Sequence, residues 1–150
     1  MKKMILTLFV IMSFSLQAEN LSWTIPSGWV DLKQTSSMRL ATLGVKDKKD
    51  LQIKITKFPG NVGGELANVN RWRRQMGLGP IAAGDLKKSL EEIDTKAGKA
   101  KLVNITNDGS QMLAVMIPHK GFTYFVKLMG KEADIKDQKK AMIELVKSMK

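Results

Sequence analysis

The chain has 150 residues and no cysteine, and its 25 lysine and arginine residues against 14 aspartate and glutamate residues give a formal net charge of +11. The lack of cysteine excludes disulfide bonds, thiolate metal ligands and a cysteine nucleophile. The excess of positive charge favours anionic partners, unless the basic residues are spread over all faces and serve only solubility.

The first 18 residues have the pattern of an export signal. Lys2 and Lys3 form a short positive region, residues 4–16 are almost all apolar, and Ala18 offers a small residue for cleavage. The apolar run is shorter than the ~20 residues that a membrane-spanning helix needs, so an uncleaved anchor is the less favoured alternative. No cysteine follows the run, which excludes a bacterial lipoprotein. We therefore predict a signal peptide at residues 1–18, a single periplasmic or secreted domain at residues 19–150, and no transmembrane segment after cleavage.

Three strands are predicted in the first part of this domain. Residues 21–25 alternate and are rich in β-formers, and the proline and glycine of residues 26–28 then make a turn. Residues 38–45 and 51–58 are the second and third strands, and the charged residues 46–50 between them predict a hairpin. The apolar residues of the third strand share one face, as in a half-buried strand: Leu51, Ile53 and Ile55.

A helix is predicted within residues 58–81, which hold the densest group of special residues in the chain. The apolar side of this helix is formed by Leu66, Val69, Trp72 and Met76. Arg71 points almost directly away from that side, and Asn70 and Arg74 face solvent. Gly77 is placed to end the helix.

More strands and a closing helix are predicted after that point. Residues 85–92 suit either a short helix or a run into a strand. Strands are predicted at residues 101–106, 111–118 and 122–129, and the short turns between them make them antiparallel. Asp134 is predicted to cap a final helix, whose outer side carries Lys136, Lys139, Lys140 and Lys147. This order predicts one α+β domain, in which helices pack on an antiparallel sheet of about six strands in two runs.

The residue types that an enzyme needs are scarce. His119 is the only histidine, it sits in a predicted turn, and no GxSxG motif is present. A metal site would have to use carboxylates alone, and the acidic pairs at residues 91–92 and at 134 and 137 are interpreted as helix-end residues. Two distant carboxylates could still meet in the fold. We expect a protein that is not an enzyme and that uses no metal and no cofactor.

The glycines at positions 60, 63 and 64 precede the predicted helix and superficially resemble a phosphate-binding loop. Helix N-termini attract anions, but this spacing matches neither GxGxxG nor a P-loop. Glu65 falls in the first turn, where its carboxylate would repel a phosphate. A structural turn with positive φ angles is therefore the favoured interpretation.

Two asparagines in one helix indicate specific hydrogen bonds, because asparagine is a mediocre helix former. One interpretation is that they tie the helix to the glycine loop or to a neighbouring strand. The other is that a polar helix face is a recognition surface. On the second interpretation the candidate binding residues are Asn68, Asn70, Arg71 and Arg74. The residues interpreted as a structural motif are Gly60, Gly63, Gly64, Trp72, Arg73 and Gly77.

The string GG-x-x-ANVNRWR-x-Q-x-GL at residues 63–78 resembles a motif of short exported bacterial proteins of uncharacterised function. In these proteins a W-x-x-P-x-G-W opening and an S-x-M-R-L strand precede the motif, as at residues 23–29 and 36–40 here. The layout also resembles the PsbP-like α/β/α sandwich, named after a photosystem II accessory protein. That resemblance implies a binding or assembly factor rather than an enzyme.

The leading hypothesis is an exported binding or accessory domain that acts by protein interaction in the cell envelope. The alternative is a basic domain that binds anionic lipid or cell-wall polymer, with salt-sensitive affinity. An enzyme that uses Glu65 is the third hypothesis. The expected partner is an envelope protein or an anionic surface, and not nucleic acid.

Overall fold

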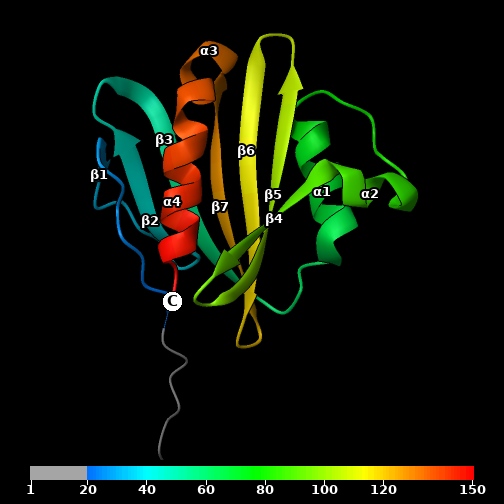
Figure 1. Cartoon of the computed structure of the whole chain (residues 1–150), viewed down its shortest axis with the longest axis horizontal. Coiled ribbons are helices and arrows are strands. Elements are labelled where there is room, and N and C mark those ends of the chain that lie inside the picture. The colour runs from blue at the N-terminus through cyan, green and yellow to red at the C-terminus, as the bar shows by residue number, and fades with distance from the viewer. Residues whose placement is uncertain (1–19) are drawn as a thin grey trace, which may run out of the picture.

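The computed structural model describes residues 20–150, so the predicted signal peptide lies outside the described residues. The described chain forms a seven-stranded antiparallel sheet with helices on both faces (Figure 1). The strand order is β1-β2-β3-β7-β6-β5-β4. The predicted α+β class with an antiparallel sheet is confirmed, and the sheet has seven strands where about six were expected.

The two runs of strands join at the centre of this sheet, where β3 pairs with β7. The first run is β1 (Trp29–Asp31), β2 (Arg39–Val45) and β3 (Lys48–Pro59). Two helices follow, α1 (Gly64–Gln75) and α2 (Ala83–Ser89). The second run is β4 (Leu90–Thr95), β5 (Gly98–Asn107), β6 (Ser110–His119) and β7 (Phe122–Lys131). The chain closes with α3 (Glu132–Ile135), the 3-10 turn η1 (Lys136–Gln138) and α4 (Lys139–Ser148).

The predicted strand at residues 21–25 is wrong, because this segment has no regular secondary structure. Ser22 alone exchanges two backbone hydrogen bonds with Lys150, at 3.0 and 3.1 Å, and a single bridge does not make a ladder. The first strand is instead β1, which begins at Trp29. Residues 85–92 contain both predicted alternatives, the end of a short helix and the start of a strand, since α2 ends at Ser89 and β4 begins at the next residue.

The predicted cap at Asp134 is also wrong. Asp134 lies inside α3, and no side chain caps the N-terminus of α3 or of α4. Its Oδ1 atom instead accepts a hydrogen bond from Lys48 Nζ at 2.6 Å. The cation on β3 therefore holds the carboxylate that the sequence pattern assigned to a helix end.

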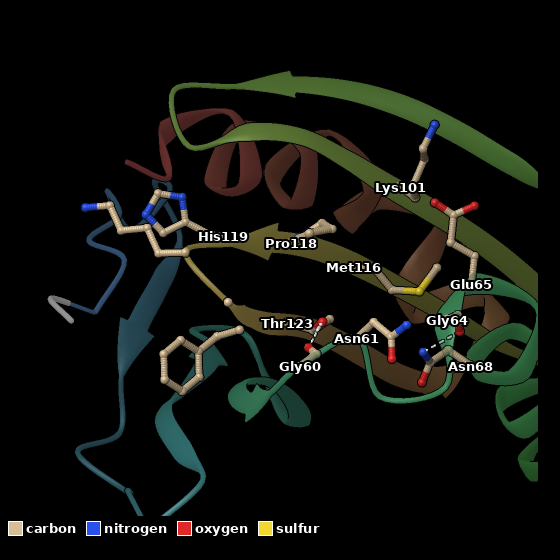
Figure 2. A pocket seen from close by; sticks show the side chains of 13 residues that line it. Gly60, Asn61, Gly64, Glu65, Asn68, Lys101, Met116, Pro118, His119 and Thr123 are labelled. Atoms are coloured by element: carbon tan, nitrogen blue, oxygen red, sulfur yellow. Dashed lines mark hydrogen bonds between the residues drawn. The ribbon is translucent and has the colours of Figure 1, made fainter.

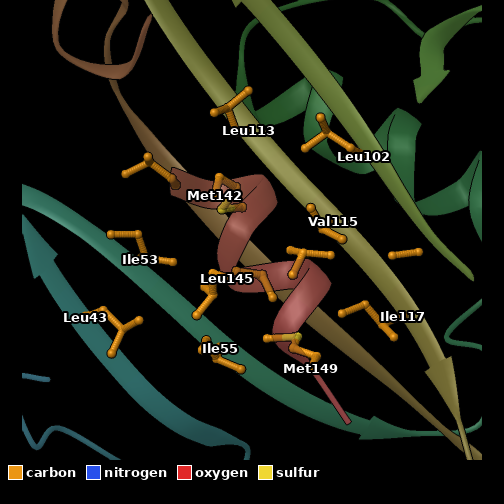
Figure 3. Close-up of a cluster of buried hydrophobic side chains, with 14 of the residues drawn as sticks. Leu43, Ile53, Ile55, Leu102, Leu113, Val115, Ile117, Met142, Leu145 and Met149 are labelled. Atoms are coloured by element: carbon orange, nitrogen blue, oxygen red, sulfur yellow. The ribbon is translucent and has the colours of Figure 1, made fainter. Parts of the chain in front are cut away.

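One face of the sheet carries the larger hydrophobic core. The alternating apolar residues of β3, β6 and β7 point to this face, and α4 packs across them (Figure 3). From α4 and the residue that follows it, the buried side chains are Met142, Leu145, Val146 and Met149. The predicted face of Leu51, Ile53 and Ile55 belongs to this core. The apolar residues that recur at every second position of the strands pack here against those that recur with the helical period of 3.6 residues in α4.

The opposite face carries a smaller core under α1. Val69 and Trp72 of α1 and the following residue Met76 are buried against side chains of three strands: Val103, Ile105, Met112, Ala114, Met116 and Phe125. Helices thus cover both faces of the sheet, with α4 on one and α1 on the other (Figure 1). Beside α1, the same face of β2 and β3 carries polar side chains.

The acidic pair Glu91 and Glu92 lies on strand β4 and not at a helix end, which corrects the sequence interpretation. Glu91 Oε2 accepts a hydrogen bond from Lys139 Nζ of α4 at 2.7 Å. Glu92 pairs with Lys101 Nζ at 2.5 Å and with Lys99, both on the neighbouring strand β5. These residues form a cross-strand charge ladder at the edge of the sheet.

Replacing Glu92 with glutamine is expected to lower stability near neutral pH only slightly, because the ion pairs of Glu92 lie at the surface. Hydrogen bonds from Lys101 and Lys99 hold the pKa of Glu92 at about 2, below its ordinary value of 4.5. A carboxylate with a lowered folded-state pKa stabilises the fold above its unfolded pKa and loses this effect as the pH falls through the folded value. The gap between the urea midpoints of the two proteins should therefore be smaller at about pH 3 than at about pH 6, and it should close only below about pH 2. An equal gap at both pH values would contradict this role.

Candidate functional site

The loop that leads into α1 holds three consecutive residues in the left-handed region. The angle φ is +51° at Val62, +84° at Gly63 and +83° at Gly64. Glycine adopts such angles freely, whereas a β-branched residue rarely does. A Cβ atom at Gly63 would also lie 3.3 Å from the Cβ atom of Ala67. The glycines therefore make the turn, and Val62 is a strained point within it.

Asn68 fastens this loop to α1. Its side chain is 1% exposed. The Nδ2 atom donates to the carbonyl oxygens of Gly64 at 2.7 Å and of Val62 at 3.3 Å. The Oδ1 atom is buried and has no hydrogen-bond partner among the described residues. Asn68 thus stabilises the left-handed turn through two hydrogen bonds from α1.

Asn70 fastens the other end of the motif. Its Nδ2 atom donates to the carbonyl oxygen of Ile81 at 3.1 Å, and its Oδ1 atom accepts from the Ile81 N–H at 2.8 Å. Arg73 Nε donates to the carbonyl oxygen of Gly79 at 2.7 Å. Both side chains therefore bind the segment that follows α1 back onto the helix.

The C-terminus of α1 is closed by Gly77, whose φ angle is +74°. The Gly77 N–H donates to the Arg74 carbonyl at 3.0 Å, and the Leu78 N–H donates to the Arg73 carbonyl at 2.9 Å. This pair of bonds is a Schellman motif, which satisfies the last helical carbonyls. Both ends of α1 are thus fixed, so the direction of its outward side chains is fixed as well.

A cavity of about 570 Å³ lies between the loop before α1 and the β6–β7 hairpin, and we call it the loop cavity (Figure 2). Its lining mixes polar and apolar side chains, among them Asn61, Glu65, Lys101, Met116, His119 and Phe122. His119 Nδ1 lies 3.1 Å from the Ala97 carbonyl oxygen, so this nitrogen carries the proton and donates. His119 and Glu65 lie at opposite ends of the cavity in Figure 2, so they do not form an acid–base pair.

Among residues 20–150, no group of three or more histidine, aspartate or glutamate side chains is placed to hold a metal ion. In the same part of the chain, no helix has the length and apolar character to cross a bilayer.

A second cavity of about 270 Å³ lies beside α1, over strands β2, β3 and β7, and we call it the basic groove. Four cations from four elements line it: Arg39 of β2, Lys54 of β3, Lys127 of β7 and Arg71 of α1. No acidic residue is among its lining residues, and none of the four cations forms an ion pair within the described chain. The groove is therefore a concentration of uncompensated positive charge.

Lys127 lies at the centre of this charge. Burial lowers the pKa of Lys127, and the charges of Lys54 and Arg71 lower it further. Lys54 is its direct partner across the β3–β7 ladder. The only hydrogen bond of the Lys127 ammonium to the described chain goes to Gln75 Oε1, at 3.2 Å. The charged form of Lys127 is thus held at a cost that a bound anion would reduce.

The floor of the basic groove is aromatic. The rings of Trp72 and Phe125 meet edge to face, with their centroids 5.6 Å apart and an interplanar angle of 87°. Phe58 lies 5.8 Å from Phe125 at a tilt of 55°. Trp72 and Phe125 are almost fully buried, whereas Phe58 and the neighbouring Val62 are only partly covered. The groove therefore combines a positive rim with reachable apolar surface.

The four predicted binding residues lie in different places. Only Arg71 lines the basic groove. Arg74 is exposed and lines neither cavity, while the amides of Asn68 and Asn70 are engaged internally.

Arg39, Lys54 and Lys127 of the groove were not among the binding residues predicted from the sequence. A signal for Lys127 was present, since it is the one charge within the apolar stretch FTYFVKLM. Lys54 likewise alternates with Ile53 and Ile55 and so had to lie on the face opposite the larger core.

The chain is only weakly similar to known proteins. No protein-family model matches the chain, and no curated protein matches it in sequence. A solved structure of a Bacteroides thetaiotaomicron protein is similar at 13% identity and a TM-score of 0.46, over 87% of this chain but only 44% of that one. Cyanobacterial PsbP (CyanoP) from Synechocystis is similar at 16% identity and a TM-score of 0.49, over 83% of this chain and 82% of that one.

LpqN, described as involved in cell envelope biogenesis of Mycobacterium tuberculosis, is similar at 14% identity and a TM-score of 0.45. This likeness covers 86% of this chain and 81% of that one. These likenesses are too low to assign a family or a function. The resemblances to the exported-protein motif and to the PsbP-like sandwich therefore stay predictions.

Proposed function

We propose that this chain is an exported binding domain, which acts as an accessory in the cell envelope by holding an acidic segment of a partner protein in the basic groove. The observation that carries the proposal is the set of four unpaired cations around one cavity. The envelope location rests on the predicted signal peptide at residues 1–18. Binding rather than catalysis is proposed, since among the described residues no hydrogen bond joins the Thr123 hydroxyl of the loop cavity to His119 or to Glu65.

Uncompensated charge of this kind favours an anionic ligand. Like charges that face each other across a strand pair repel, so Lys54 and Lys127 destabilise the fold unless a counter-charge is near. Clefts lined by one sign of charge also concentrate ligands of the opposite sign and raise their association rate. Of the four helix residues considered as binding residues from the sequence, the proposal retains Arg71.

The test replaces two groove cations without adding charge. The double variant Arg71→Gln, Lys127→Met should bind a fluorescently labelled oligo-glutamate peptide about 10- to 100-fold more weakly than the unchanged protein, since each lost contact to a carboxylate weakens binding up to tenfold. Methionine at position 127 fills the same half-buried space and removes a charge that burial disfavours, so the fold should remain intact. Fluorescence anisotropy measures the affinity, and circular dichroism checks the fold.

The matched control removes the same amount of charge from the other side of the sheet. Lys136→Gln, Lys140→Met changes two exposed lysines next to or within α4, far from the groove. This control should keep affinity within about twofold of the unchanged protein, because distant exposed charges are screened. Equal losses in both double variants would mean that binding follows net charge, and the groove assignment would then be wrong.

A second candidate function is binding of anionic lipid or cell-wall polymer without a defined pocket. Its supporting observation is the exposed lysine side of the final helical segment, where Lys136, Lys140 and Lys147 surround a shallow depression. In this case the α4 control would lose more affinity for anionic vesicles than the groove variant. The two double variants therefore separate the two candidates.

A further inference from the structure

We propose that the basic groove recognises an acidic segment that carries one aromatic side chain between its carboxylates. This inference rests on the proposed function and adds a second requirement to it, an apolar anchor. The observations behind it are the size of the groove, its aromatic floor and the positions of its cations.

The size of the groove limits what can enter it. Its volume of about 270 Å³ lies below the range of ~300–1,000 Å³ in which drug-sized ligands bind. A single large side chain fits this space, while the rest of the partner stays outside. Interfaces commonly concentrate affinity in such a pocket, with an aromatic anchor surrounded by polar contacts.

The floor favours an aromatic anchor over an aliphatic one. Phe58, Phe125 and Trp72 already form a chain of tilted and edge-to-face contacts with centroid distances of 5.8 and 5.6 Å. Phe58 ends this chain and is only partly covered, and Val62 stands beside it. An incoming ring can continue the series at the 4.5–7 Å spacing that aromatic pairs prefer.

The cations lie at two places in the groove. Lys54 pairs directly with Lys127 across the β3–β7 ladder, and the charge of Arg71 also acts on Lys127, so these three cations lie close together. Arg39 stands apart from them on β2, a strand that β3 separates from β7, so the two strands are about 10 Å apart. This distribution suits carboxylates at two separate points better than a single phosphate group.

The experiment compares two labelled peptides that have the same charge. One has two glutamates on each side of a central phenylalanine, and the other has glycine at the centre. The phenylalanine peptide should bind about tenfold more tightly, because one added aromatic contact is worth about one decade of affinity. Phosphatidylglycerol vesicles provide a third probe, which presents phosphate groups without a peptide.

Two variants locate this preference. Phe58→Thr keeps a residue with high strand propensity at this position and should reduce the preference to about twofold, since the partly covered end of the aromatic floor is lost. Phe122→Thr is the matched control, because Phe122 is also partly buried but lines the loop cavity. This control should keep the tenfold preference.

The outcomes separate the inference from the proposed function. Equal affinity of the two peptides for the unchanged protein, with binding still lost in Arg71→Gln, Lys127→Met, would overturn the aromatic anchor and leave the groove proposal standing. Peptide binding that this double variant does not change would overturn both. Tight vesicle binding without peptide binding would identify a lipid as the occupant and would also overturn the inference.

Discussion

Replacing Trp72 with alanine is expected to lower the free energy of unfolding by about 3–5 kcal/mol, the usual cost of deleting a large buried aromatic side chain. Trp72 is 4% exposed and packs edge to face on Phe125. It is the largest residue by which α1 holds to the sheet, in a core smaller than the one under α4. Domains of this size have a total free energy of unfolding of ~5–15 kcal/mol, so the variant should lose a large part of its stability.

Urea unfolding followed by far-ultraviolet circular dichroism measures this loss, and Trp72→Phe is the conservative control. Phenylalanine keeps a ring against Phe125, so the control should lose much less stability than the alanine variant. Because Trp72 also lines the basic groove, the folded fraction of Trp72→Ala should bind the acidic aromatic peptide more weakly. A loss below about 1 kcal/mol in the alanine variant would show that α1 is held mainly by other contacts.

Replacing Leu145 with alanine is expected to cost about 2–5 kcal/mol, for a cavity in the larger core. Leu145 is 0% exposed and projects from α4 among side chains of β3 and β6 (Figure 3). The surrounding strands are fixed by pairing on both sides, which limits how far they can collapse into the space. The stability loss should therefore approach that of Trp72→Ala.

The two core substitutions should differ in their effect on binding. Leu145 lies on the face of the sheet opposite the basic groove, so folded Leu145→Ala should keep its affinity for the peptide within about twofold, as expected for sites without shared contacts. Anisotropy titrations at low temperature, where both variants are folded, provide the comparison. An affinity loss in Leu145→Ala as large as that in Trp72→Ala would show that the two faces are not independent.

The basic groove departs from the pattern that stability alone would favour. Lys54 and Lys127 face each other across β3 and β7 without a counter-charge, whereas on the β4–β5 ladder of the same sheet Glu92 pairs with Lys99 and Lys101. Cross-strand pairs of opposite charge stabilise a sheet, and like pairs destabilise it. Two like charges that face each other on neighbouring central strands are the kind of local cost that functional sites retain.

Much of the fold could be predicted because its signals are local. The alternation of Leu51, Ile53 and Ile55 and the helical spacing of Val69, Trp72 and Met76 each fix one buried face. The glycine after α1 supplies a positive φ angle that few other residues accept. These features depend on neighbours within a few residues, so the sequence alone determines them. The misplaced strand at residues 21–25 had the same local pattern but lacked a partner strand, which no local signal reports.

The candidate site, by contrast, depends on contacts between distant parts of the chain. Asn68 and Asn70 looked alike in the sequence, yet the structure gives one to the loop before α1 and the other to the segment after it. Arg39, Lys54, Arg71 and Lys127 become neighbours only because β3 pairs with β7 and α1 lies beside that pair. Strand order is set by which apolar faces bury one another across the whole domain. The sequence by itself therefore determined the faces of the individual elements, and only the tertiary structure decided which charges meet.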